Sequence, residues 1–99
     1  MQLIPQTPDE AKKMVTLTRA HIGASLKAIG TISSPIAIET PLVIQPSEKN
    51  DAHWTALEYD GKTYTLEAGS PIQIVDGVLG LIRINKPSGN NVAVHLVRT

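Results

Sequence analysis

The chain has 99 residues, a net charge of zero and no cysteine. This length fits one domain, and the lack of cysteine excludes a disulfide scaffold and thiolate chemistry. Zero net charge argues against a nucleic-acid partner held mainly by electrostatics. No apolar run approaches the roughly 20 residues of a membrane span, and the N-terminus lacks a signal-peptide pattern. We therefore expect a protein of the cytoplasm or of a virion, with no membrane partner and no secretion by a signal peptide.

The first third of the chain predicts a helix. Residues 1–7 read as a flexible arm, and Thr7-Pro8-Asp9-Glu10 has the residues of a capping box at a helix start. Apolar residues then recur at helical spacing, so we predict a helical segment over 8–29. The alternation of β-branched residues in 15–18 supports a strand there instead, and Gly23 weakens a continuous helix.

Residues 36–99 predict a β-rich body. Ile36–Thr40 reads as a strand, and Pro41 confines it to a sheet edge or a bulge before residues 42–44 resume an extended course. Residues 81–84 are apolar on both alternating faces apart from Arg83, which predicts a strand covered on both sides or bulged at Gly80. Residues 92–97 alternate as a last strand, with His95 expected opposite Leu81 in a hairpin.

Two Asp-Gly pairs predict tight hairpins, at Asp60-Gly61 and Asp76-Gly77, because a type I′ turn needs positive φ at both central residues. For the first hairpin the expected register places Tyr59 opposite Lys62. It continues with two further pairs: Leu57 opposite Tyr64, and Thr55 opposite Leu66.

The residues that could carry chemistry form no convincing catalytic or cofactor motif. The histidines, at positions 21, 53 and 95, are too scattered for a zinc site. Asp51 and His53 would share a face on a strand, but a solvated loop explains them better. Gly61-Lys62-Thr63 lacks the earlier glycine of a phosphate-binding loop. We therefore expect no enzyme activity, no metal and no cofactor.

Two regions are candidate contact surfaces. The polar loop 85–91 lies between two strands, and loops on rigid sheets often bind partners. In the predicted helix, apolar residues seven apart form a candidate coiled-coil seam for oligomerisation, although the same stripe would also pack on the protein's own sheet. The candidate partner contacts are Asn85, Lys86, Ser88, Asn90 and Asn91, and the candidate oligomer seam is Val15, Ile22 and Ile29.

In composition and in the style of its strands at 35–44 and 70–99, the chain resembles small β-rich virion proteins of bacteriophages, of the decoration, penton-like or fibre-head type. This resemblance involves no motif, so no site residues are transferred from it. It implies a non-enzymatic structural or assembly protein that packs against protein partners, as a homo-oligomer or with other particle subunits. The alternative is a small monomeric binding or regulatory module that acts on a larger protein partner.

The fold class predicted from the sequence is α+β: an N-terminal helix followed by about six mostly antiparallel strands in a small sandwich or barrel-like sheet. An all-β fold is the alternative, if residues 15–18 form a strand.

Overall fold

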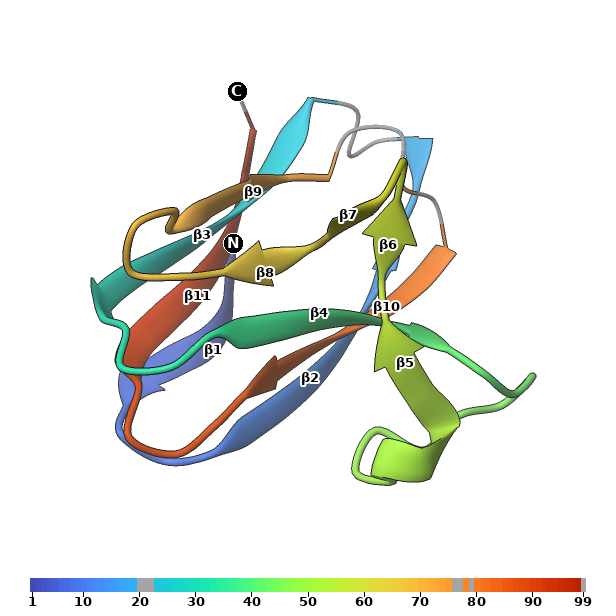
Figure 1. The fold of residues 1–99 in the computed structure, drawn as a ribbon, viewed down its shortest axis with the longest axis horizontal. Helices are drawn as coiled ribbons and strands as arrows, with labels where there is room; N and C mark the ends of the chain where they lie inside the picture. The colour runs from blue at the N-terminus through green and yellow to red at the C-terminus, as the bar shows by residue number, and fades with distance from the viewer. Residues whose placement is uncertain (20–22, 76–77, 79, 99) are drawn as a thin grey trace.

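The computed structural model describes residues 1–19, 23–75, 78 and 80–98 and shows a β-sandwich of two antiparallel sheets (Figure 1). Sheet A has the strand order β1 (Gln2–Thr7), β11 (Asn91–Arg98), β3 (Ala24–Thr31), β9 (Ile72–Ile74). Sheet B has the order β2 (Ala11–Leu17), β10 (Gly80–Lys86), β4 (Ile36–Pro41), β5 (Trp54–Ala56), and β8 (Thr65–Leu66) also pairs with β4. A separate hairpin joins β6 (Glu58–Tyr59) and β7 (Lys62–Thr63), and a 3-10 turn, η2, spans Asp51–His53.

The core lies between the two sheets and follows from strand alternation. In β3, Ala24, Leu26 and Ala28 are buried whereas Lys27 and Ile29 are exposed, because successive side chains point to opposite faces. The inward-facing aliphatic residues of both sheets form one cluster: Ile4, Leu17, Leu26, Ile36, Ile38, Leu66, Ile82, Ile84, Val92, Val94 and Leu96.

Consecutive strands cross between the sheets at one end of the sandwich. The chain passes from β1 to β2 and from β10 to β11 through tight turns, and in each case the two strands belong to different sheets. Gly89 N–H donates to Pro8 O at 2.8 Å and thereby joins the two turns. Asn90 is fully buried, and its Oδ1 accepts from the amides of Ser33 (2.6 Å) and Ser34 (3.0 Å).

The predicted α+β class is wrong, because residues 8–29 contain no α-helix in the part that the structure describes. Residues 11–17 and 24–31 are strands β2 and β3, and residues 2–7, predicted to be a flexible arm, form β1. Thr7 Oγ1 accepts the Asp9 amide at 3.3 Å. The expected capping chemistry instead stabilises a turn between β1 and β2. The cross-strand pairs that β2 and β3 make with β10 and β11 outweigh the helical spacing.

The predicted coiled-coil seam required that helix, so this prediction is wrong as well. Val15 lies in β2, opposite Ile82 of sheet B, and Ile29 lies in β3, opposite Ala93 of sheet A. Ile22 lies outside the described residues. Val15 and Ile29 are therefore on different sheets and form no helical stripe.

The Asp60-Gly61 hairpin is confirmed. Asp60 and Gly61 both have positive φ, as a type I′ turn requires, and Tyr59 pairs with Lys62 as predicted. Tyr64 N–H also donates to Leu57 O at 2.9 Å, which fits their predicted opposition. The register ends there, because residues 55 and 66 both pair with β4 instead of with each other: Thr55 lies opposite Thr40, and Leu66 lies opposite Ile36. The Asp76-Gly77 turn lies outside the described residues.

Three further expectations concern single strands. Residues 81–84 lie in β10, where Ile82, Arg83 and Ile84 are all buried, so the prediction of a strand covered on both faces is confirmed. β4 is an interior strand rather than an edge, because it pairs with β10 on one side and with β5 and β8 on the other. Pro41 is tolerated there because it is the last residue of β4 and lies beyond the pairs with β10. His95 does not oppose Leu81, since β10 and β11 belong to different sheets.

Candidate functional site

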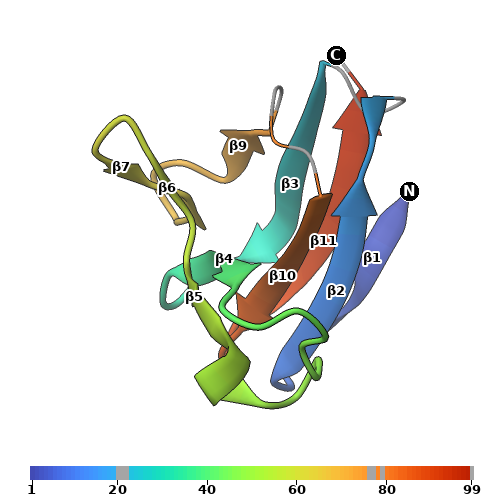
Figure 2. The ribbon, with the colours of Figure 1, turned by 90° about the vertical axis from the view of Figure 1, so that its right-hand side faces the viewer.

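The candidate site lies on the outer face of sheet B and is centred on Arg83. Ile82 and Ile84 point into the core, so alternation turns Arg83 to the opposite face, opposite Glu39 of β4 and Met14 of β2. An arginine on an outer face is usually exposed, but Arg83 is fully buried. The segment that covers it is the connection from β4 to β5, residues 42–53 (Figure 2).

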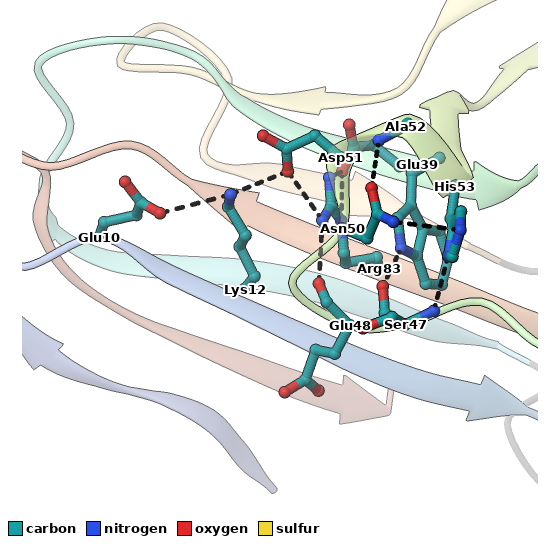
Figure 3. A network of polar contacts seen from close by, with 11 residues as sticks. Glu10, Lys12, Glu39, Ser47, Glu48, Asn50, Asp51, Ala52, His53 and Arg83 are labelled. Atoms are coloured by element: carbon teal, nitrogen blue, oxygen red, sulfur yellow. Dashed lines mark hydrogen bonds and ion pairs between the residues drawn. The ribbon is translucent and has the colours of Figure 1, made fainter.

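Arg83 binds both that connection and its neighbours on sheet B (Figure 3). Its Nε donates to Glu39 Oε1 at 2.7 Å, and its Nη1 donates to the backbone oxygen of Glu48 at 2.9 Å. Nη1 also lies 3.0 Å from Asp51 Oδ1. Nη2 lies 2.7 Å from the same oxygen of Glu39, without hydrogen-bond geometry, and has no hydrogen-bond partner among the described residues. The guanidinium stacks near Trp54, with Cζ 5.2 Å from the ring centroid.

Further hydrogen bonds fix the shape of the connection. Trp54 Nε1 donates to Ser47 O at 2.9 Å, and the Ser47 amide donates to His53 Nδ1 at 3.0 Å. The Asn50 side chain caps η2 by accepting the Ala52 amide at 3.1 Å. We call this arrangement of Arg83 and residues 47–54 the clamp.

The clamp is also attached to the edge strand β2. Lys12 Nζ donates to Asp51 Oδ1 at 2.8 Å and lies 3.4 Å from Glu10 Oε1, while Glu48 Oε2 accepts the Met14 amide at 2.8 Å. Hydrogen bonds from Lys12 and Arg83 lower the pKa of Asp51, and the hydrogen bond to Asp51 raises the pKa of Lys12. Asp51 and Lys12 are therefore held in their charged forms at neutral pH.

The clamp supports an exposed apolar tip, which we define as residues 42–44. Leu42 N–H donates to His53 O at 2.7 Å, and beyond it the chain bends away from the sheet. Leu42 is 61% exposed, Val43 40% and Ile44 99%. These residues were predicted to resume an extended strand, and that prediction is wrong. Three adjacent aliphatic side chains on a fixed loop are a feature that marks contact surfaces.

Residues 85–91, which contain the predicted partner contacts, do not all belong to an exposed loop. Asn85 and Lys86 belong to β10, Asn91 begins β11, and Lys86 and Asn90 are fully buried. Lys86 Nζ donates to Thr7 O at 2.6 Å and lies 3.5 Å from Val92 O. Ser88 and Asn91 are exposed, and their role as contacts stays a prediction.

Asp51 and His53, the pair considered above for chemistry, both have structural partners. Asp51 and His53 sit in η2, where the first is paired with Lys12 and Arg83 and the second accepts from Ser47. Two further acidic residues, Glu58 and Glu67, each accept a hydrogen bond from a nearby threonine. In the described ranges, no group of three or more histidine and acidic side chains is placed to hold a metal ion. No helix within those ranges is long and apolar enough to cross a bilayer.

Sequence reasoning missed the clamp and its tip. The one signal was Arg83 within an apolar strand predicted to be covered on both faces, because a buried arginine requires acidic or carbonyl partners. The pattern did not identify those partners, since Glu39, Glu48 and Asp51 read as surface charges. Comparisons with protein-family models, with curated proteins and with solved structures each find no match for this chain.

Proposed function

We propose that this protein is a non-enzymatic structural or assembly protein, a subunit of a virion or a similar particle that packs through protein–protein contacts. The observation that carries this proposal is the apolar tip held on the clamp. Leu42, Val43 and Ile44 are displayed to solvent, although the loop that carries them is tied down by hydrogen bonds and ion pairs on both sides.

The physical argument concerns both the apolar surface and its rigidity. Burying a leucine, valine or isoleucine side chain contributes about 1.5–3 kcal/mol, so three such side chains offer substantial contact energy. A loop that is already ordered loses little conformational entropy on binding. The charged groups of the clamp hold the connection that carries the tip, which is a structural task. The tip therefore favours a protein surface as its partner.

The test is light scattering on a size-exclusion column at two protein concentrations. We expect a mass above the 10.6 kDa of one chain that rises with concentration. A variant with Leu42→Ser, Val43→Ser and Ile44→Ser should have a lower average mass at the same concentrations. The matched control is Tyr59→Ser, which removes an exposed aromatic side chain from the β6–β7 hairpin. A wild-type chain that stays monomeric at both concentrations would contradict assembly and favour a binding module for a larger partner.

A further inference from the structure

A cleft lies at one end of the sandwich, between two connections that cross from one sheet to the other. Residues 32–35 lead from β3 of sheet A to β4 of sheet B, and residues 67–71 lead from β8 back to β9 of sheet A (Figure 1). Residues 32–35 and 67–69 line the cleft, whose volume is about 310 Å³. Pockets for small ligands span roughly 300–1,000 Å³, so this cleft suits a single side chain better than a large molecule.

The wall formed by residues 67–71 is held at both of its ends. At the β8 end, Leu66 pairs with Ile36 of β4. At the β9 end, Pro71 O accepts the Ala28 amide of β3 at 2.9 Å. The connection is therefore fixed to both sheets, and its position beside residues 32–35 follows from the two strand pairs.

The opposite wall is held by the buried side chain of Asn90. Its Oδ1 accepts the amides of Ser33 (2.6 Å) and Ser34 (3.0 Å), and its Nδ2 donates to Ser34 Oγ at 3.2 Å. The Ser33 hydroxyl donates to Gly89 O at 3.0 Å, which leaves the lone pairs of its oxygen available to accept. This wall is thus ordered before any ligand binds and loses little conformational entropy on binding.

Glu67 is the one charged residue among those that line the cleft. The segments that form and flank the two walls, residues 28–38 and 63–75, contain no other charged residue. Thr65 Oγ1 donates to Glu67 Oε1 at 3.2 Å and orients the carboxylate. In the part of the chain that the structure describes, no cation forms an ion pair with Glu67, whereas Asp51 of the clamp has two. The cleft therefore carries one negative charge that the chain itself does not neutralise.

We propose that this cleft binds the ammonium group of a lysine side chain from a protein partner. The inference rests on the proposed function, which supplies the protein partner, and adds a contact separate from the apolar tip. An ammonium has three donors, and the carboxylate of Glu67 and the hydroxyl oxygen of Ser33 are acceptors, while Ile32 and Pro35 provide apolar surface for the lysine stem. A guanidinium binds a carboxylate best through both oxygens, and Oε1 already accepts from Thr65, so lysine fits better than arginine.

The first experiment uses a blocked lysine, Nα-acetyl-lysine N-methylamide, as the probe. Glu67 is exposed, so solvent screens the contact, and we expect a Kd of roughly 1–10 mM. The amide NMR signals of Ser33, Ser34 and Gly69 should shift and saturate as the probe is added at constant ionic strength. The Nε-acetylated form of the same probe has no charge and should leave these signals in place. Higher salt should weaken the binding of the charged probe.

Two variants then identify the carboxylate. Glu67→Gln keeps the size of the side chain but removes its charge and should weaken binding by about fivefold. The matched control is Glu58→Gln, which removes another exposed carboxylate that accepts from a threonine but lies on the β6–β7 hairpin, and it should bind the probe like wild type. Equal affinity of wild type and Glu67→Gln, or no saturating shift in wild type, would overturn the proposal and leave an adventitious cation only.

The result is independent of the test of the proposed function, because Glu67 belongs to neither the tip nor the clamp. A chain that assembles in light scattering but does not bind the blocked lysine overturns the cleft and leaves assembly through the tip in place. A chain that binds the blocked lysine through Glu67 but stays monomeric supports the cleft, contradicts self-assembly and favours a larger protein as the partner.

Discussion

Arg83 and Lys86 lie three residues apart in the same strand, both are fully buried, and their surroundings are opposite. Arg83 points to the outer face of sheet B and contacts two carboxylates, a backbone carbonyl and an aromatic ring. Lys86 points to the inner face, where its ammonium donates to the backbone oxygen of Thr7 and lies near that of Val92.

The difference shows two ways in which a strand can contain a buried cation. A cation paired with carboxylates keeps its charge and holds the groups that surround it, so Arg83 fixes the 42–53 connection on the sheet. A cation whose hydrogen bonds go to carbonyl groups bears the cost of desolvation, and burial lowers the pKa of Lys86, partly offset by the charge of Asp9. The first cation organises a surface, whereas the second closes the end of the core.

The largest effect is expected from Arg83→Met. This change leaves Glu39, whose side chain is largely buried, without its ion-pair partner and removes the anchor of the clamp. Breaking a buried ion pair costs about 3 kcal/mol or more in unfolding free energy, a large share of the roughly 5–15 kcal/mol of a typical domain. Urea denaturation measures the loss, and the Leu42 amide, which donates to His53 O, should exchange faster with solvent.

Arg83→Lys is the matched control for this prediction. It keeps the positive charge but loses the planar guanidinium that contacts Glu39, the Glu48 carbonyl and Trp54 together, so we expect an intermediate loss of stability. A loss below about 1 kcal/mol for Arg83→Met would mean that the clamp does not depend on this ion pair.

The two cations also show what could be predicted from the sequence. The alternation around Arg83 predicted a strand covered on both faces, and the Asp60-Gly61 pair predicted its hairpin, because both are local signals. What covers Arg83 depends on a loop more than thirty residues away in the chain, and no local pattern identifies it.

The N-terminal error has a similar cause. Thr7 and Asp9 have the residues of a helix cap, and the apolar residues after them satisfy a helical stripe as well as a strand. The strand is favoured over the helix because β2 and β3 pair with β10 and β11, which lie at the other end of the sequence. The tip at residues 42–44 was missed for the opposite reason, because its aliphatic residues favour a strand whereas the clamp holds them in a bend.

A smaller effect is expected from Lys86→Met, which keeps the length of the side chain and removes its charge. Replacing a poorly compensated buried charge by an apolar group is often neutral or stabilising, so unfolding free energy at neutral pH should stay within about 1 kcal/mol of wild type or rise. The folded pKa of Lys86 lies below the ordinary value of 10.5. At pH values between the folded pKa and 10.5, the unfolded state therefore binds more protons than the folded state.

Wild-type stability should therefore gain a contribution from Lys86 as pH rises toward 10.5, and Lys86→Met should remove this gain. Lys12 acts in the opposite direction, because its folded pKa is raised and its contribution is lost as pH rises through that value. The difference in thermal midpoint between wild type and Lys86→Met, followed from neutral to alkaline pH, isolates the Lys86 contribution. A difference that does not change with pH would show that Lys86 keeps its ordinary pKa.

The smallest effect is expected from Asp51→Asn. Its side chain is mostly exposed, so solvent screens its pairs with Lys12 and Arg83, and Glu39 still holds the guanidinium. Because the folded pKa of Asp51 lies below its ordinary value of 3.8, its contribution to stability is full above that value and is lost as pH falls through the folded pKa. Thermal unfolding from about pH 6 to about pH 2 should therefore show a shallower acid loss for Asp51→Asn than for wild type. Parallel acid profiles would show that Asp51 contributes nothing to the acid sensitivity of the clamp and would leave it as a surface charge.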